Sequence, residues 1–168
     1  FVLGGALSQY PSGWLADKFD RRWILIWLSA AGVATCALTI ALSSGGAAMV
    51  LLASALFGAA TFPIYSVSAA HSHDFAKSHE RVELSAALMF LYALGAIAAP
   101  YLTSRLIDLY GSDAMFLFIA AAHVVLIVFG LVRMRARPTE ARRTRYVYAP
   151  RTTFIIGRLL GRSRDEPR

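Results

Sequence analysis

Long apolar segments separated by short charged stretches dominate this chain. No Asp, Glu, Lys or Arg occurs over residues 23–73, 84–104 or 114–132. A helix of about 20 apolar residues crosses the hydrocarbon core of a bilayer, so the second and third segments are each about one crossing long. The first segment is long enough for about two crossings. It is interrupted at 43–46 by the sequence SSGG, whose glycines favour a turn between helices.

This pattern predicts an all-α integral membrane protein. A soluble helical domain would carry charged residues at helical period on its outer faces, and these segments carry none. The composition agrees, since 57% of the residues are hydrophobic and only 16% are charged. The predicted membrane-spanning helices are 1–16 (partial), 23–43, 47–70, 84–108 and 113–132. We divide the chain into a transmembrane bundle at 1–132 and a basic tail at 133–168.

The first predicted helix is short and begins without a methionine. It is shorter than a comfortable crossing and lacks the basic flank of a signal peptide. We therefore expect the chain to begin inside a transmembrane helix and further residues of the protein to precede it. The alternative interpretation is a short membrane protein that does not transport and acts in assembly or regulation.

The distribution of Lys and Arg predicts the orientation, because these residues accumulate on cytoplasmic loops. If the helices alternate in direction, 17–22, 71–83 and the tail lie on one side and hold 16 of the 17 basic residues. Arg105 alone lies on the other side. The sequence therefore predicts a multi-pass protein of a bacterial-type inner membrane with a cytoplasmic C-terminus.

The net charge of +7 is concentrated in the tail, which holds 11 arginines and three acidic residues. Beside a membrane exit, such a segment favours the anionic headgroups of the inner leaflet over nucleic acid. Ile155, Ile156, Leu159 and Leu160 fall near one helical face. This part of the tail is compatible with an interfacial helix or with a solvated segment.

The stretch GWLADKFDRR concentrates charge at one short connection between two apolar helices. Its pattern reads Gly13-x-x-x-Asp17-Lys18-x-Asp20-Arg21-Arg22. It resembles the G-x-x-x-D-[RK]-x-G-R-[RK] signature of the major facilitator superfamily and departs from it at Asp20, where the family usually has Gly. The stretch also resembles a bacterial branch of mostly uncharacterised sugar- or drug-transporter-like proteins.

The resemblance implies part of the C-terminal six-helix bundle of a twelve-helix secondary transporter. Four spans follow the motif before the tail, so the bundle would comprise the end of helix 8 and helices 9 to 12. In the family, the copy of the motif at this position works against the N-terminal bundle, which this sequence does not contain. The residues implied to serve the cytoplasmic gate are Gly13, Asp17, Lys18, Arg21 and Arg22.

Transporters of this architecture bind a small solute near the bilayer midplane, between two halves. The residues expected to line that cavity are Gln9, Thr61, Tyr65 and Tyr92. Small residues serve close helix packing and prolines bend helices. The residues expected in these roles are Gly58, Pro63, Gly95 and Pro100. The segment GAIAAP at 95–100 is similar to the family's G-x-x-x-G-P motif, with Ala99 in place of the second Gly.

A group of histidines and acids at 71–80 offers an alternative, because such side chains bind metals in some membrane-bound enzymes. The group forms only one short cluster, so we expect a polar loop, no enzymatic activity, no metal and no cofactor. His123, inside the last span, is expected to be a neutral packing residue. With Cys36 as the single cysteine, no intrachain disulfide forms.

Overall fold

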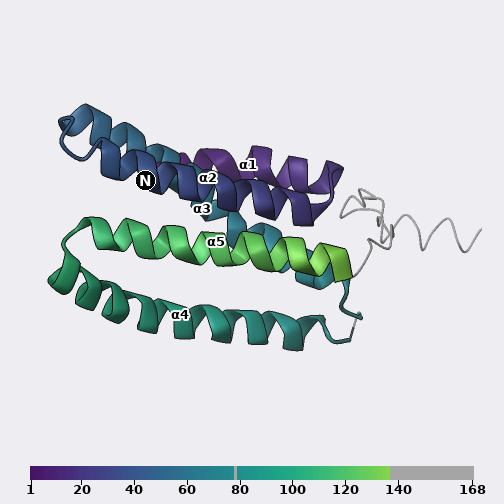
Figure 1. The fold of residues 1–168 in the computed structure, drawn as a ribbon. Coiled ribbons are helices and arrows are strands. Elements are labelled where there is room, and N and C mark those ends of the chain that lie inside the picture. The colour runs from purple at the N-terminus through teal and green to yellow at the C-terminus, as the bar shows by residue number, and fades with distance from the viewer. Residues whose placement is uncertain (78, 137–168) are drawn as a thin grey trace, which may run out of the picture. The chain divides into compact units, whose positions relative to one another are not determined.

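The computed structural model of this chain describes residues 1–77 and 79–136, which contain five α-helices and no β-strand. The helices are α1 (Val2–Lys18), α2 (Arg21–Ala41), α3 (Ala47–Asp74), α4 (Arg81–Tyr110) and α5 (Asp113–Ala136). They belong to one compact unit and follow the chain from purple to green in Figure 1. The predicted all-α fold is confirmed.

The helices α2 to α5 are long and apolar enough to cross a membrane, while α1 has 17 residues. The helices α3 and α5 run farthest past their predicted ends, α3 through Asp74 and α5 through Ala136. Charged residues mark where an apolar segment ends, but a helix continues into the interface as long as its backbone hydrogen bonds persist. The interfacial helix considered for the tail lies outside the described residues.

The connections between the helices lie at two opposite ends of the bundle. Gly46 and Gly111 adopt positive φ values of 83° and 87°, a backbone conformation that glycine tolerates without strain, and they precede α3 and follow α4. Both turns lie at one end of the helices, whereas the α1–α2 and α3–α4 connections lie at the other (Figure 1). The helices therefore alternate in direction.

Small residues allow the helices to pack closely. The helix α1 packs on α3, and α2 lies between α3 and α5. A Cβ added at Gly4 would overlap the carbonyl of Ala55, and one added at Gly58 would overlap the carbonyl of Phe1. Backbones can approach this closely only where side chains are absent, which is a common basis of helix association in lipid.

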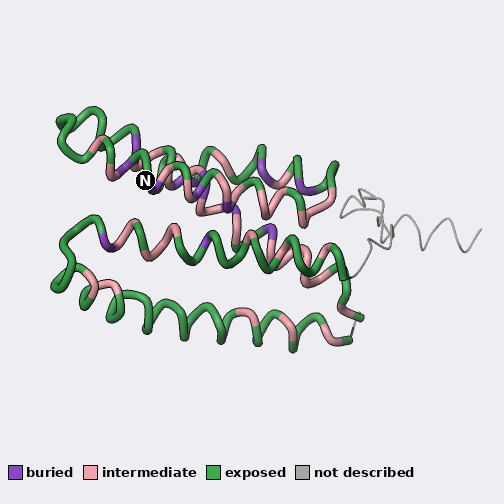
Figure 2. The backbone as a smooth tube through the Cα atoms, viewed as in Figure 1, coloured by how far each residue is buried: buried purple, intermediate pink, exposed green. Residues whose placement is uncertain are grey.

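Burial is uneven across the bundle. The helix α2 buries Ser29, Gly32, Cys36 and Thr39 between its neighbours. In contrast, α4 buries no residue and is exposed along nearly its whole length (Figure 2). It lies beside α5 and touches α3 at few points. Within the described residues, α4 therefore presents a long face without a protein partner.

Candidate functional site

The connection between α1 and α2 consists of Phe19 and Asp20 alone, and we call residues 17–22 the charged joint. The Phe19 amide donates to the Leu15 carbonyl (2.8 Å) and so ends α1. The Asp20 side chain accepts a hydrogen bond from the Arg22 amide (3.0 Å) and so begins α2. Aspartate is a favoured N-cap residue, which gives a physical reason for Asp20 where the motif usually has glycine.

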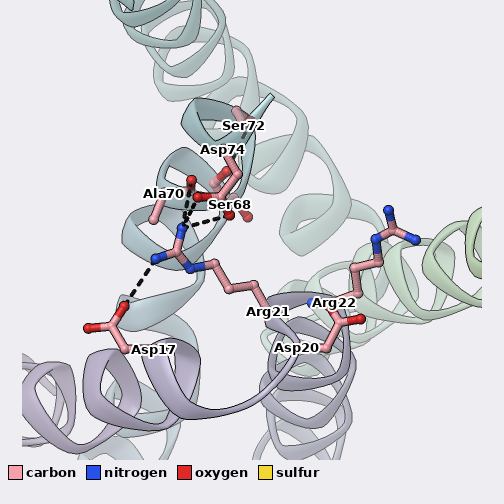
Figure 3. A network of polar contacts seen from close by, with 8 residues as sticks. All are labelled: Asp17, Asp20, Arg21, Arg22, Ser68, Ala70, Ser72 and Asp74. Atoms are coloured by element: carbon pink, nitrogen blue, oxygen red, sulfur yellow. Dashed lines mark hydrogen bonds and ion pairs between the residues drawn. The ribbon is translucent and has the colours of Figure 1, made fainter. Parts of the chain in front are cut away.

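Arg21 joins the ends of three helices (Figure 3). Its Nη1 donates to both carboxylate oxygens of Asp74 on α3, at 2.7 and 2.8 Å. The same atom donates to the Ala70 carbonyl (2.9 Å). Its Nη2 donates to Asp17 on α1 at 3.0 Å. We call Arg21, Asp17, Asp74 and the Ala70 carbonyl the Arg21 cluster.

The two ion pairs of the Arg21 cluster differ in exposure. The side chain of Arg21 is 23% exposed and that of Asp74 41%, whereas that of Asp17 is 71% exposed. Water and salt screen an exposed pair, so the Arg21–Asp74 pair contributes more to stability than the Arg21–Asp17 pair. A cation beside the last turn of α3 also interacts favourably with the negative end of the helix dipole.

The other motif residues lie outside this cluster. The Arg22 side chain is directed away from Asp74 (Figure 3). The Lys18 ammonium lies over the ring of Trp14, 3.8 Å from its centroid. Gly13 is half-buried, and a Cβ added there would have no described heavy atom within 4 Å. Of the motif residues, Asp17 and Arg21 therefore belong to the Arg21 cluster, while Gly13, Lys18 and Arg22 lie outside it.

The structure brings two of the predicted cavity residues together. The rings of Tyr65 on α3 and Tyr92 on α4 lie 5.2 Å apart, and both side chains are exposed. Thr61, one turn before Tyr65, is half-buried and donates its hydroxyl to the Phe57 carbonyl (2.8 Å). Gln9 is exposed on α1, a helix that packs on α3.

The predicted packing residues fall into two environments. Gly58 and Pro63 are buried on α3, where Gly58 lies against the start of α1. Gly95 and Pro100 are exposed on α4, and a Cβ added at Gly95 would meet no described atom within 4 Å. Close contact at the α4 positions is therefore not made within the described part of the chain.

Asp74 was not predicted as a partner of the motif. Residues 71–83 were expected to form a loop, whereas α3 continues through Asp74 and places the carboxylate against Arg21. The available signal was a carboxylate one turn after the apolar span, on the same side of the membrane as three basic motif residues.

The histidines occupy separate places. Within the described residues no group of three or more His, Cys, Asp or Glu side chains is arranged to hold a metal ion. His73 Nε2 lies 3.3 Å from Ser85 Oγ and links the end of α3 to the start of α4. Ser85 Oγ also donates to the Arg81 carbonyl (2.8 Å). His123 is buried against Gly32 at the contact of α5 with α2.

Comparison with known proteins gives a consistent result. The family model described as Major Facilitator Superfamily matches residues 1–164. An uncharacterised MFS-type transporter of Enterobacter sp. (strain 638), Ent638_1421, is 30% identical over 140 residues, which cover 82% of this chain and 35% of that protein. The uncharacterised MFS-type transporter YcaD of Salmonella arizonae is 30% identical over 127 residues, which cover 76% of this chain and 32% of that protein. YcaD of Escherichia coli (strain K12 / DH10B) is 32% identical over 132 residues, with the same coverage of 76% and 32%. No solved structure gives a significant match.

Proposed function

Because this chain belongs to the major facilitator superfamily, we propose that it forms the C-terminal part of a secondary transporter that moves a small solute across the membrane by alternating access. It spans about a third of the length of the relatives it matches. The four long helices that follow the charged joint support a correspondence of α1 with the end of helix 8 and of α2 to α5 with helices 9 to 12.

The Arg21 cluster is the observation that carries this proposal. It connects the ends of α1, α2 and α3 at the charged joint, and we propose that these ends move together when the gate opens. Only Oδ1 of Asp17 is bonded by Arg21, and the carboxylate is 71% exposed. We propose that Asp17 also accepts hydrogen bonds from a helix N-terminus in the N-terminal bundle, where the helix dipole favours an anion. This contact would hold the charged end closed.

The solute site is proposed between α3 and α4. Tyr65 and Tyr92 lie against each other there with exposed rings, and Thr61 lies one turn away on α3. Exposed α4, with Gly95 and Pro100, supports one wall of this space, which the N-terminal bundle would close from the opposite side. Gln9 on the exposed side of α1 would then face the same space.

The membrane location follows from the same sequence features. We propose a bacterial-type inner membrane, with the charged joint and the C-terminus in the cytoplasm, because 16 of the 17 basic residues fall on that side if the helices alternate. The proposed partners are the solute, the bilayer with its anionic lipids at the basic tail, and the N-terminal bundle of the same protein.

The test uses the full-length protein with Tyr92 replaced by cysteine and the rate of maleimide labelling at that position. Asp17→Asn removes the charge that holds the charged end closed. A dipole interaction of about 1 kcal/mol corresponds to about a fivefold change in the open population, and we expect the labelling rate to rise by about that factor. Asp20→Asn is the matched control, because asparagine is an equally good N-cap. Equal labelling rates in the two variants, at equal membrane abundance, would contradict the gate assignment.

A further inference from the structure

One histidine, His71, lies beside the Arg21 cluster. It occupies the last turn of α3, directly after the apolar segment that ends at Ala70. Ala70 supplies the carbonyl that Arg21 binds, and Asp74 follows His71 by three residues, a spacing that makes two side chains neighbours on a helix. The imidazole is half-buried and packs edge-on against the ring of Phe75, with the ring centroids 5.1 Å apart. His71 therefore lies one helical turn from the carboxylate that holds Arg21.

Charged groups of both signs surround His71. Those that act on it come from the charged joint and from α3 itself: Asp20, Arg21, Arg22 and Asp74. The other helices that contact α3 also carry ionisable residues at this end, Asp17 and Lys18 on α1 and Arg81 and Glu83 on α4. The two arginines of the joint disfavour a proton on the imidazole, whereas the carboxylates favour it.

The balance of these effects determines when His71 is charged. Burial lowers the pKa of the imidazole below its ordinary value of about 6.5, and Arg22 lowers it further, whereas Asp74 and Asp20 act in the opposite direction. The ring is therefore neutral in this arrangement at about pH 7.5. An arrangement in which the pKa of a histidine is lowered binds a proton less readily than an open one. It therefore loses stability as the pH falls below about 6.5.

We propose that His71 makes the Arg21 cluster sensitive to the pH on its side of the membrane, because a proton on the imidazole weakens the pair of Arg21 with Asp74. The imidazolium attracts the Asp74 carboxylate and repels the Arg21 guanidinium, so both effects act against the same pair. Acid would thereby release the end of α3 from the start of α2. The proposal concerns the cluster itself and goes beyond transport, so it does not depend on a role of the cluster in gating.

The other histidines occupy different surroundings. His73 Nε2 lies 3.3 Å from Ser85 Oγ on α4, and His123 is buried against Gly32 inside the bundle. His79 lies in the α3–α4 connection beside Glu80, and its side chain is 78% exposed. His79 is therefore a matched control for the loss of a titratable imidazole at the same end of the helices.

The experiment measures the strength of the Arg21–Asp74 pair at two pH values in the full-length protein. A double-mutant cycle of Arg21→Gln and Asp74→Asn, followed by reversible unfolding in mixed detergent micelles, separates this pair from other effects of pH. At about pH 7.5 we expect the coupling to change the unfolding equilibrium constant by about fivefold. At about pH 5.5 we expect almost no coupling, because a like charge one helical turn away has an effect of similar size.

Substitutions at His71 separate the imidazole from other titrating groups. With His71→Gln the coupling should stay at about fivefold at both pH values. With His71→Lys, which is charged at both, it should be nearly absent at both. His79→Gln should leave the fall of the coupling with pH unchanged. Equal coupling at the two pH values with His71 in place would overturn the proposal. A fall that persists in the His71→Gln variant would also overturn it, because another group then titrates.

A second measurement does not depend on unfolding. Nuclear magnetic resonance of isotope-labelled histidine follows the titration of His71, whose signal is identified by its absence from the His71→Gln variant. Linkage is reciprocal, so loss of the pair in Arg21→Gln should raise the midpoint of this titration by about 0.7 pH unit, which corresponds to a change of about fivefold in proton affinity. An unchanged midpoint would show that the proton and the pair are independent, and the proposal would be wrong.

Discussion

At the scale of single residues, the geometry of Arg21 explains why the joint needs arginine at this position. A planar guanidinium donates in several fixed directions, and here its two terminal nitrogens reach Asp74 and Ala70 on one side and Asp17 on the other. A lysine ammonium is a compact donor group and cannot span these partners with the same geometry. The motif therefore depends on the shape of the side chain as well as on its charge.

The first prediction concerns the relative strength of the two ion pairs. In a double-mutant cycle with Arg21→Gln, we expect a coupling free energy of about 1 kcal/mol with Asp74→Asn and less than about 0.5 kcal/mol with Asp17→Asn. The reason is exposure, which is 41% for Asp74 and 71% for Asp17. Reversible unfolding of the full-length protein in mixed detergent micelles measures both couplings. A larger coupling with Asp17 would show that solvent screening does not determine the order.

Arginine and lysine can be compared directly at position 21. Arg21→Lys keeps the charge but loses the simultaneous contacts to α1 and α3, so we expect it to lose at least half of the stability that Arg21→Gln loses. The measurement is the same unfolding transition, with Lys77→Gln as a control for the removal of a basic residue outside the cluster. Wild-type stability of the Arg21→Lys variant would show that charge alone is sufficient.

At the scale of helices, glycine has a different role in α3 and in α4. Gly58 lies where the backbone of Phe1 approaches α3, so the contact has no room for a methyl group. Gly95 lies on a face with no described atom within 4 Å. Glycine thus permits close helix packing at position 58 and lies on an exposed helix face at position 95, although the sequence pattern around the two glycines is similar.

The same substitution should therefore have opposite effects at these two positions. Gly58→Ala should destabilise the full-length protein by about 1–3 kcal/mol, since overpacking against backbone cannot be relieved by a rotamer change. Gly95→Ala should be neutral or stabilising by up to about 1 kcal/mol, because alanine is the better helix former. Thermal unfolding of both variants measures the difference. Destabilisation by Gly95→Ala would show that another segment of the full-length protein packs closely on this face of α4.

Sequence reasoning identified the helices well because a bilayer imposes one strong rule on them. Segments without charge must cross the hydrocarbon core, and the predicted helices at 23–43, 47–70 and 84–108 overlap α2, α3 and α4. The helix ends could not be read in this way, because charge marks the bilayer surface and not the last hydrogen-bonded turn. For this reason Asp74 was assigned to a loop.

The candidate site was only partly accessible from the sequence. The motif identified Asp17 and Arg21, whose contact is local to one connection. The contact of Arg21 with Asp74 joins positions 53 residues apart, and no periodicity in one sequence reveals such a pair. Gly13 shows the opposite case, because the resemblance implied a role for it at the gate, whereas no described residue lies close to it. Long-range partners depend on how the helices pack, and packing is a property of the fold.

At the scale of the whole molecule, the alternation of the helices makes the orientation testable. The α1–α2 and α3–α4 connections lie at one end of the helices, and the turns at 42–46 and 111–112 lie at the other (Figure 1). The basic residues Lys18, Arg21, Arg22 and Lys77 lie at the first end, and because an excess of basic residues in short loops favours the cytoplasmic side, we predict that this end is cytoplasmic. Alkaline phosphatase inserted after Ser44 should therefore be active, and the same enzyme inserted after Lys77 should be inactive. A fluorescent protein that folds only in the cytoplasm should give the reverse pattern at the same two positions and controls for insertion. Activity of phosphatase at Lys77 would reverse the proposed orientation and place the charged joint, with its Arg21 cluster, on the outer side.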